Sequence, residues 1–361
     1  LMAEMMRIPY SEVAKIALVP ALLYFFAILV MVHFEALKTR IGTIPVAERP
    51  RVGAVFRKGW FYLVPIVVLF AILFSGSTAS LAAFWAIISF LGLMAVRYFA
   101  RGEFKQFFVT LFDALADGGD KSLIIGSTAG PVGIIVGIAL LTGVAFKFSA
   151  LVMSYTFGMP WIALLLLMVA TFVLGMGMTV TADYLILAVL AVPALGEMGV
   201  PLLAAHLAAF WFSQSSNVTP PVCMAAFAGA SIASSHPYLT ALQAMRFSAY
   251  LYLMPFMFVY SPILMPNGLT GEVVYTWIVL FFSAVPFAAG LTGYLFGDLS
   301  IPQRAILVLS ALLFVFPTTG ADWIAGGLFL AVIVPQYLKS RRTASGSAEL
   351  EACGTSERVM S

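Results

Sequence analysis

Two clusters of helix-breaking residues lie inside sequence that is otherwise apolar enough for a lipid bilayer. The first occupies residues 175–181 and the second occupies residues 215–221. Backbone that leaves a helix at membrane depth exposes N–H and C=O groups that lipid cannot satisfy. Such breaks persist only where protein, water or an ion supplies the missing partners. Paired interruptions of this kind are typical of a transporter's binding site, so the pattern favours part of a secondary transporter.

The composition places the chain among integral membrane proteins. Of its 361 residues, 62% are hydrophobic and only 10% are charged, whereas a soluble domain carries about a quarter of charged residues. Apolar runs long enough to span a bilayer recur along the chain, which predicts an all-α polytopic membrane protein. The net charge of +3 is small and lies in loops, so we expect no nucleic-acid partner.

Cysteine and histidine give no sign of a disulfide framework or a metal centre. The two cysteines are too few for a framework, and the three histidines lack the spacing of metal ligands. An intramembrane enzyme would need clustered acids or histidines at a membrane face, and only Asp183 and Glu197 are near each other in sequence. We therefore expect no catalytic residues, and no cofactor other than a coupling ion.

The distribution of basic residues predicts the orientation of the chain. Residues 37–59 carry six Lys and Arg against one Glu, and Arg97, Arg101 and Lys105 form a second basic group. The positive-inside rule places both groups on the cytoplasmic side.

Apolar runs and breaks divide the chain into six expected segments. Residues 1–36 are expected to hold the end of a first repeat and a membrane span, and residues 37–59 to form a basic cytoplasmic loop. Residues 60–122 are expected to hold scaffold spans and an interfacial amphipathic helix, and residues 123–236 to form a transport domain, the second repeat, with a re-entrant hairpin. Residues 237–338 would form the C-terminal spans, and residues 339–361 a disordered cytoplasmic tail. The amphipathic helix is expected over residues 103–116, where Phe and Leu recur at helical spacing. A plain loop helix packed on the protein is the alternative.

A weak internal repeat relates the N-terminus to a later part of the chain. A shift of 228 positions places Pro9-Tyr10 on Pro237-Tyr238 and Leu23-Tyr24 on Leu251-Tyr252. By this register the counterpart of residues 217–221 would precede residue 1. We therefore expect a C-terminal fragment whose first repeat is mostly missing. Inverted-repeat transporters place substrate and ion sites where two such halves meet.

The first break combines flexible backbone with oxygen ligands. Gly175 and Gly177 permit positive φ and close approach, and Thr179 and Thr181 supply hydroxyl groups. Freed carbonyl groups can coordinate a hard cation such as Na⁺. A helix that begins near Thr181 would direct its N-terminal N–H groups at an anionic substrate. The alternative is a helix-packing site built on small residues.

The second break is polar over consecutive residues. Its polar side chains belong to Ser215, Ser216, Asn217 and Thr219. Pro220 and Pro221 remove two backbone donors and block a helix. This pattern predicts an oxygen-rich cage for Na⁺, with Gly175, Thr181, Asn217 and Thr219 as candidate ligands. The alternative is a polar loop between ordinary spans, but residues 202–212 are too short to cross a bilayer.

Asp183 follows the first break and carries one of the few charges in the apolar region. An intramembrane carboxylate is costly and indicates a functional role by default. It could bind a cation, carry a proton or pair with Lys147. Alternatively, it lies in water at a hairpin tip, where the helix dipole favours an acid. We interpret His206 as a buried polar residue rather than as a ligand.

At these residues the sequence resembles the large membrane subunit (DctM-like) of tripartite ATP-independent periplasmic (TRAP) transporters. The similarity is greatest to the fused-permease type that works with TAXI solute-binding proteins. It rests on Gly175-Met176-Gly177-Met178, Thr181-Ala182, Pro201 to His206, Asn217 to Pro221 and Pro255 to Tyr260, within a resemblance that covers the chain from Leu1 to the C-terminal spans. The family commonly has Pro where Thr179 stands and a small apolar residue at Asp183.

This resemblance implies an inverted-repeat, elevator-type transporter with broken helices and re-entrant hairpins in the bacterial or archaeal cytoplasmic (inner) membrane. It implies Na⁺-coupled uptake of a small organic acid that a periplasmic TAXI-type binding protein delivers to this lipid-embedded subunit. One alternative is a carboxylate symporter of the same superfamily that needs no binding protein. An intramembrane enzyme is a further alternative.

Overall fold

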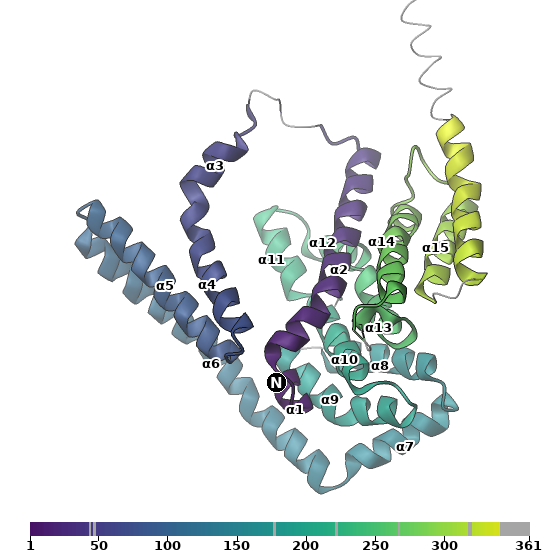
Figure 1. The fold of residues 1–361 in the computed structure, drawn as a ribbon, viewed down its shortest axis with the longest axis horizontal. Helices are drawn as coiled ribbons and strands as arrows, with labels where there is room; N and C mark the ends of the chain where they lie inside the picture. The colour runs from purple at the N-terminus through teal and green to yellow at the C-terminus, as the bar shows by residue number, and fades with distance from the viewer. Residues whose placement is uncertain are drawn as a thin grey trace, which may run out of the picture.

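Long apolar helices dominate the structure, a computed structural model that describes residues 1–339 apart from 43–44, 46–47, 176–177, 221–222, 266–267 and 317–319 (Figure 1). Among the described residues, five helices are long and apolar enough to cross a membrane. They are Tyr10–Lys38, Ala79–Ala100, Val180–Glu197, Gly271–Thr292 and Gly320–Lys339. The prediction of an all-α polytopic membrane protein is confirmed. Apart from Lys339, the expected tail over 339–361 lies outside the described residues.

The N-terminal helices are joined by a left-handed turn. α1 (Met2–Met6) ends at Arg7, whose φ is 55°, and the Ile8 N–H donates to the Ala3 carbonyl oxygen at 3.0 Å. This ending satisfies carbonyl groups that a helix end leaves free. α2 (Tyr10–Lys38) follows directly and runs through the middle of the molecule (Figure 1).

The same turn recurs in the second copy of the repeat. α11 (Met224–Ile232) is followed by Ser234, whose φ is 51°, and the Ser235 N–H donates to the Ala230 carbonyl oxygen at 2.9 Å. α12 (Pro237–Phe247) then follows as α2 follows α1. The local backbone therefore repeats where the sequence matches only weakly.

At the same register position one copy has a proline inside a continuous helix and the other has a break between two helices. Pro20 lies inside α2, where it removes a helical hydrogen bond. A shift of 228 positions leads to Ser248, which separates α12 from α13 (Tyr250–Tyr260). Leu23 and Leu251, which the register pairs, are both buried in the main core. These parallels support the repeat, with a one-residue offset at the preceding turn.

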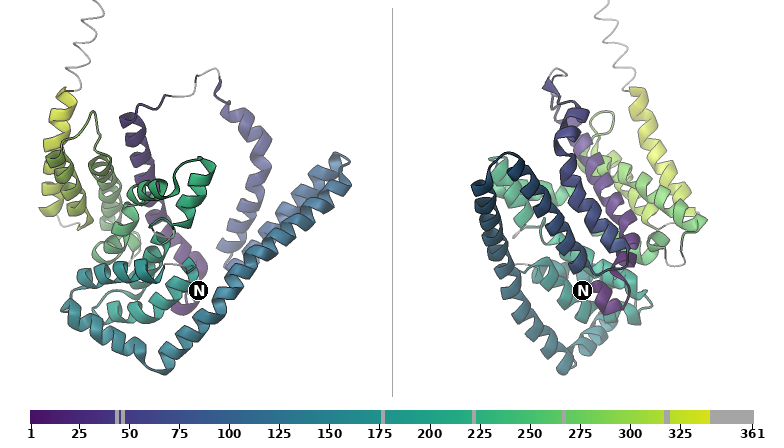
Figure 2. Two further views of the ribbon diagram at one scale, coloured as in Figure 1. Left: turned by 180° about the vertical axis from the view of Figure 1, so that it is seen from behind. Right: turned by 60° about the vertical axis from the view of Figure 1, so that its left-hand side comes forward.

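A helical arm projects from the rest of the molecule (Figures 1 and 2). Its elements are α3 (Val52–Gly59), a 3₁₀ turn (Trp60–Tyr62), α4 (Leu63–Phe74), α5 (Ala79–Ala100) and the first part of α6 (Phe104–Leu141). α4 and α5 form an antiparallel hairpin, and the Thr78 hydroxyl caps α5 by accepting from the Leu81 N–H at 3.3 Å.

α6 differs from the prediction of a short amphipathic helix over residues 103–116. It extends over 38 residues and continues through Pro131. Membrane helices tolerate Gly and Pro where neighbouring groups satisfy the freed backbone. Residues 103–116 are therefore mostly the start of a longer helix, and the segment boundary expected between 122 and 123 falls within it.

The central segment consists of short helices on either side of the two breaks, of which Val180–Glu197, with 18 residues, is the one long enough to span a membrane. They are α7 (Val144–Thr156), α8 (Pro160–Leu174), α9 (Val180–Glu197) and α10 (Leu202–Ser215). α10 has 14 residues and is about 21 Å long. A bilayer core of about 30 Å exceeds that length, so α10 does not cross alone. α9 and α10 pack together, joined through Gly199 with φ 83°.

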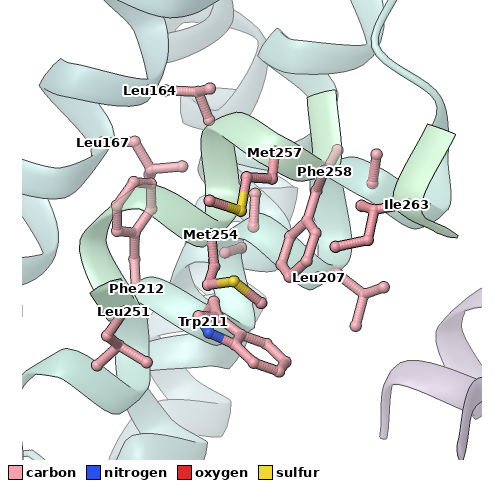
Figure 3. Close-up of a cluster of buried hydrophobic side chains, with 14 of the residues drawn as sticks. Leu164, Leu167, Leu207, Trp211, Phe212, Leu251, Met254, Met257, Phe258 and Ile263 are labelled. Carbon is pink, nitrogen blue, oxygen red and sulfur yellow. The ribbon is translucent and has the colours of Figure 1, made fainter. Parts of the chain in front are cut away.

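The main core joins these short helices to α13. Phe212 of α10, Leu164 of α8, and Met254 and Met257 of α13 have no exposed surface and face one another (Figure 3). In a membrane protein such contacts are stabilised by van der Waals packing rather than by the hydrophobic effect. The ends of α8 and α10 are therefore held in fixed positions.

The C-terminal helices form a second packed group with α2. α14 (Gly271–Thr292) packs along α15 (Ile301–Val315), and the Ser310 hydroxyl donates to the Ala325 carbonyl oxygen of the helix Gly320–Lys339 at 2.8 Å. Lys38 Nζ donates to the Thr292 carbonyl oxygen at 2.7 Å, which ties α2 to α14.

Candidate functional site

Three helix ends meet where the two breaks lie. α8 ends at Leu174, α9 begins at Val180 and α10 ends at Ser215. Gly175, just after α8, packs directly on Ser216, just after α10: a Cβ on Gly175 would lie 2.6 Å from the Ser216 Cβ. The two breaks, separate in sequence, therefore form one site.

Close packing explains why glycine stands at position 175. The added Cβ would also lie 2.8 Å from the Thr171 carbonyl oxygen, closer than real Cβ atoms come to their neighbours. The backbone of Gly175 has φ −67°, so this residue does not use the positive φ that glycine permits. Gly177, the other glycine of the first break, lies outside the described residues.

Thr179 and Thr181 have different surroundings. The Thr179 hydroxyl accepts from the Ala182 N–H at 3.3 Å and caps α9, whose N-terminus thus begins at the first break. Thr181 instead lines a pocket of about 320 Å³ with residues of α1, α2 and α10. Thr181 therefore borders this pocket at the start of α9, next to the first break.

The hydroxyl groups of the second break, and that of Ser213 just before it in α10, all donate within their own segment. Ser213 donates to the Ala209 carbonyl oxygen, Ser215 to Phe212, Ser216 to Ser213 and Thr219 to Ser215, at distances of 2.6–2.9 Å. A hydroxyl that donates its only hydrogen keeps its lone pairs. The segment thus presents oxygen acceptors that could coordinate a cation.

Tyr252 links the second break to α13 and α8. Its hydroxyl lies 2.7 Å from the Thr219 hydroxyl, and its ring packs edge-on against Phe172. Because Thr219 donates to the Ser215 carbonyl oxygen, Tyr252 is the donor of this second bond. The repeat pairs Tyr252 with Tyr24, but no local pattern in the sequence marks Tyr252 as a site residue.

Asn217 and the prolines complete the second break. Asn217 is half-buried, and its carbonyl oxygen accepts from the Ala225 N–H at 3.3 Å, so the chain folds back at the break. Pro220 is half-buried as well, whereas Pro221 lies outside the described residues.

Asp183 is fully buried in the first turn of α9. Neither of its carboxylate oxygens has a hydrogen-bond partner among the described residues. The Ser213 hydroxyl lies beside the carboxylate, but its hydrogen is donated to the Ala209 carbonyl oxygen. The burial contradicts a position in water at a hairpin tip. Lys147 is exposed and gives the carboxylate no ion pair.

A buried hydrogen bond joins α9 to α10 at the residue that follows Asp183. The Tyr184 hydroxyl lies 2.9 Å from His206 Nδ1, and both side chains are nearly inaccessible. His206 is therefore a buried residue with a hydrogen-bond partner, as interpreted from the sequence. No spacing rule in the sequence indicated that Tyr184 would be this partner.

Comparison with known proteins assigns the chain to a family. The family described as "Tripartite ATP-independent periplasmic transporter, DctM component" matches residues 1–269. The chain belongs to this family. Neither the curated proteins nor the solved structures contain a match.

Membership of the DctM family makes the chain a membrane component of a TRAP transporter, multi-pass in the cytoplasmic membrane. The family implies a periplasmic solute-binding protein as partner. The match covers both breaks, α13 and the N-terminal helices, and it ends before α14.

Proposed function

We propose that this DctM-family permease couples Na⁺ entry to the uptake of a small organic acid, which a TAXI-type periplasmic binding protein delivers. The observation that carries the proposal is the contact of Gly175 with Ser216, which joins the ends of α8 and α10 at the start of α9. Helix ends that converge inside a membrane protein supply free N–H groups with partial positive charge and free C=O groups with partial negative charge.

The donor set at the joined breaks suits a hard cation. C-terminal helix ends carry partial negative charge, and hydroxyl and carbonyl oxygens are ligands that Na⁺ accepts. Gly175, Asn217 and Thr219 would contribute to the ion site, with Ser215 and Ser216 beside them. Thr181, which faces the neighbouring pocket, would lie near the path of the substrate instead.

The N-terminus of α9 suits the carboxylate of the substrate. Its first N–H groups lack helical partners and carry partial positive charge, which attracts anions. The Thr179 cap satisfies one of these groups and fixes the start of the helix. A cation and an anion bound at adjacent helix ends would attract each other. Each would therefore favour binding of the other, which couples the two.

Asp183 adds a negative charge in the first turn of α9. A buried carboxylate without a partner is unfavourable unless a cation or a proton compensates its charge. We assign it to the cation side of the site.

The proposed division of labour follows the expected segments. Residues 123–236 would move with the bound substrate, and residues 60–122 and 237–338 would act as scaffold. The continuous α6 would connect the two parts, since it crosses their boundary.

Uptake by the complete transporter tests this function. The permease is reconstituted into proteoliposomes with its binding protein, and uptake of candidate organic acids is measured with and without an inward Na⁺ gradient. Asn217→Ala should abolish the Na⁺-dependent part. Gln106→Ala, an exposed amide on α6, is the matched control and should leave it unchanged. Normal Na⁺ dependence of Asn217→Ala would exclude the proposed ion site.

Omission of the binding protein separates the two transport hypotheses. Uptake should stop in its absence if the permease depends on it. Uptake that continues would instead indicate a symporter that needs no binding protein.

A further inference from the structure

A pocket of about 300 Å³ lies in the helical arm, away from the breaks. It is formed by the start of the α4 segment and the end of α5, and its polar and aromatic walls include Phe61, Tyr62, Arg97, Tyr98, Arg101 and Glu103. The basic residues 37–59 lead into this end of the α4–α5 hairpin. The positive-inside rule places it at the cytoplasmic membrane surface.

Two arginines face this pocket without a carboxylate partner. The Arg97 guanidinium lies 4.9 Å from the Phe61 ring centroid, and Arg97 Nη1 lies 3.5 Å from the Tyr62 hydroxyl. Arg101 lies one helical turn further along. Among the described residues, no ion pair involves either arginine. Glu103 is the acid in the lining, so the pocket carries a net positive charge.

Beyond the pocket, along the α4–α5 hairpin, apolar side chains are exposed. Ile66 and Phe70 of α4 are 50% and 49% exposed, and Phe84 and Ile87 of α5 are 54% and 59% exposed. Exposed side chains of this kind on a membrane hairpin face lipid acyl chains. A ligand with an anionic head and apolar tails would match both the arginines and this surface.

We propose that the pocket binds the phosphate of an anionic phospholipid, whose acyl chains lie along α4 and α5. Basic pockets between membrane helices on the cytoplasmic side can bind anionic headgroups. Arg supplies planar donors suited to phosphate oxygens, and the Phe61 contact holds one guanidinium in place. Bound lipid would anchor the arm at the membrane surface. The proposal requires only that the chain is a membrane protein and is independent of ion coupling.

Lipid retention by the full chain tests the site. The protein is reconstituted into phosphatidylcholine nanodiscs with a minor fraction of phosphatidylglycerol, extracted in mild detergent, and analysed by native mass spectrometry. Phosphatidylglycerol should be retained in preference to phosphatidylcholine. Arg97→Gln and Arg101→Gln should each weaken retention about fivefold, as expected for one basic residue at an anionic surface.

Two further variants define the outcome. Glu103→Gln removes the negative charge of the pocket and should strengthen retention. Arg57→Gln removes an exposed charge from the same basic region but outside the pocket and should change nothing. Equal retention of the two lipids, or unchanged retention by the Arg97/Arg101 double variant, would overturn the proposal. Release of the lipid by inorganic phosphate would show a free-phosphate site instead and would overturn it as well. Glu103→Gln keeps the test valid if the double variant fails to fold.

Discussion

Gly175 and Ser216 touch through atoms that leave no room for a side chain at position 175. This contact joins the C-terminal ends of α8 and α10, and Thr179 starts α9 beside them. Backbone groups that each break leaves unpaired are thereby gathered in one place. The arrangement explains how two weak sequence signals become a single site.

Gly175→Ala should separate the breaks and inactivate transport. The new Cβ would lie 2.6 Å from the Ser216 Cβ and 2.8 Å from a carbonyl oxygen, so we expect a loss of about 1–3 kcal/mol in the free energy of unfolding. Gly229→Ala, a helical glycine with open space around it, is the control. Thermal unfolding in detergent and uptake should both distinguish the two variants. Equal behaviour would mean that the contact is not required.

Asp183→Asn should preserve the fold but lower uptake at least tenfold. The amide keeps the shape of the buried side chain, while the charge that would balance a cation is lost. Stability without Na⁺ should be unchanged or higher, because no buried carboxylate remains. Glu197→Gln, an exposed acid at the other end of α9, should transport normally. Full uptake by Asp183→Asn would remove this carboxylate from the site.

The bond between Thr219 and Tyr252 should be measurable as a coupling. Thr219→Val and Tyr252→Phe each remove one hydroxyl of the 2.7 Å pair. We expect a coupling energy of about 0.5–1.5 kcal/mol in a double-mutant cycle on unfolding. Additive effects of the two changes would show that the pair does not hold the second break to α13.

The Tyr184–His206 pair predicts unequal costs for single and double changes. Tyr184→Phe leaves His206 Nδ1 without its buried partner, which should cost about 1–3 kcal/mol. Combining it with His206→Leu removes both polar groups, so the double variant should be more stable than Tyr184→Phe alone. Chemical denaturation of the purified protein provides the comparison. A double variant that is less stable would contradict this assignment.

The sequence predicted the features that depend on local chemistry. Apolar runs indicated a multi-pass helical protein, and Pro220 marked the second break because proline acts on its own backbone. Gly175 marked the first break, although the reason for glycine there is its close packing on Ser216 rather than backbone freedom. The left-handed turns at Arg7 and Ser234 were not predicted, since neither residue is glycine.

Features that depend on packing between distant segments could not be predicted. Three such features depend on how α8, α9, α10 and α13 pack. They are the Gly175–Ser216 contact, the position of Tyr252 and the Tyr184–His206 hydrogen bond. The burial of Asp183 likewise depends on how the helices pack, so it could not be predicted from the sequence.

Selective stabilisation by Na⁺ tests the central claim, that the joined breaks bind a cation, most directly. Thermal unfolding of the complete purified protein is compared in NaCl and KCl at equal ionic strength. Ligand at about a hundred times its Kd adds about 2.7 kcal/mol to stability, so Na⁺ should raise Tm and K⁺ should not. Gly175→Ala should lose this difference. Identical Tm values in the two salts for the unaltered protein would contradict the account.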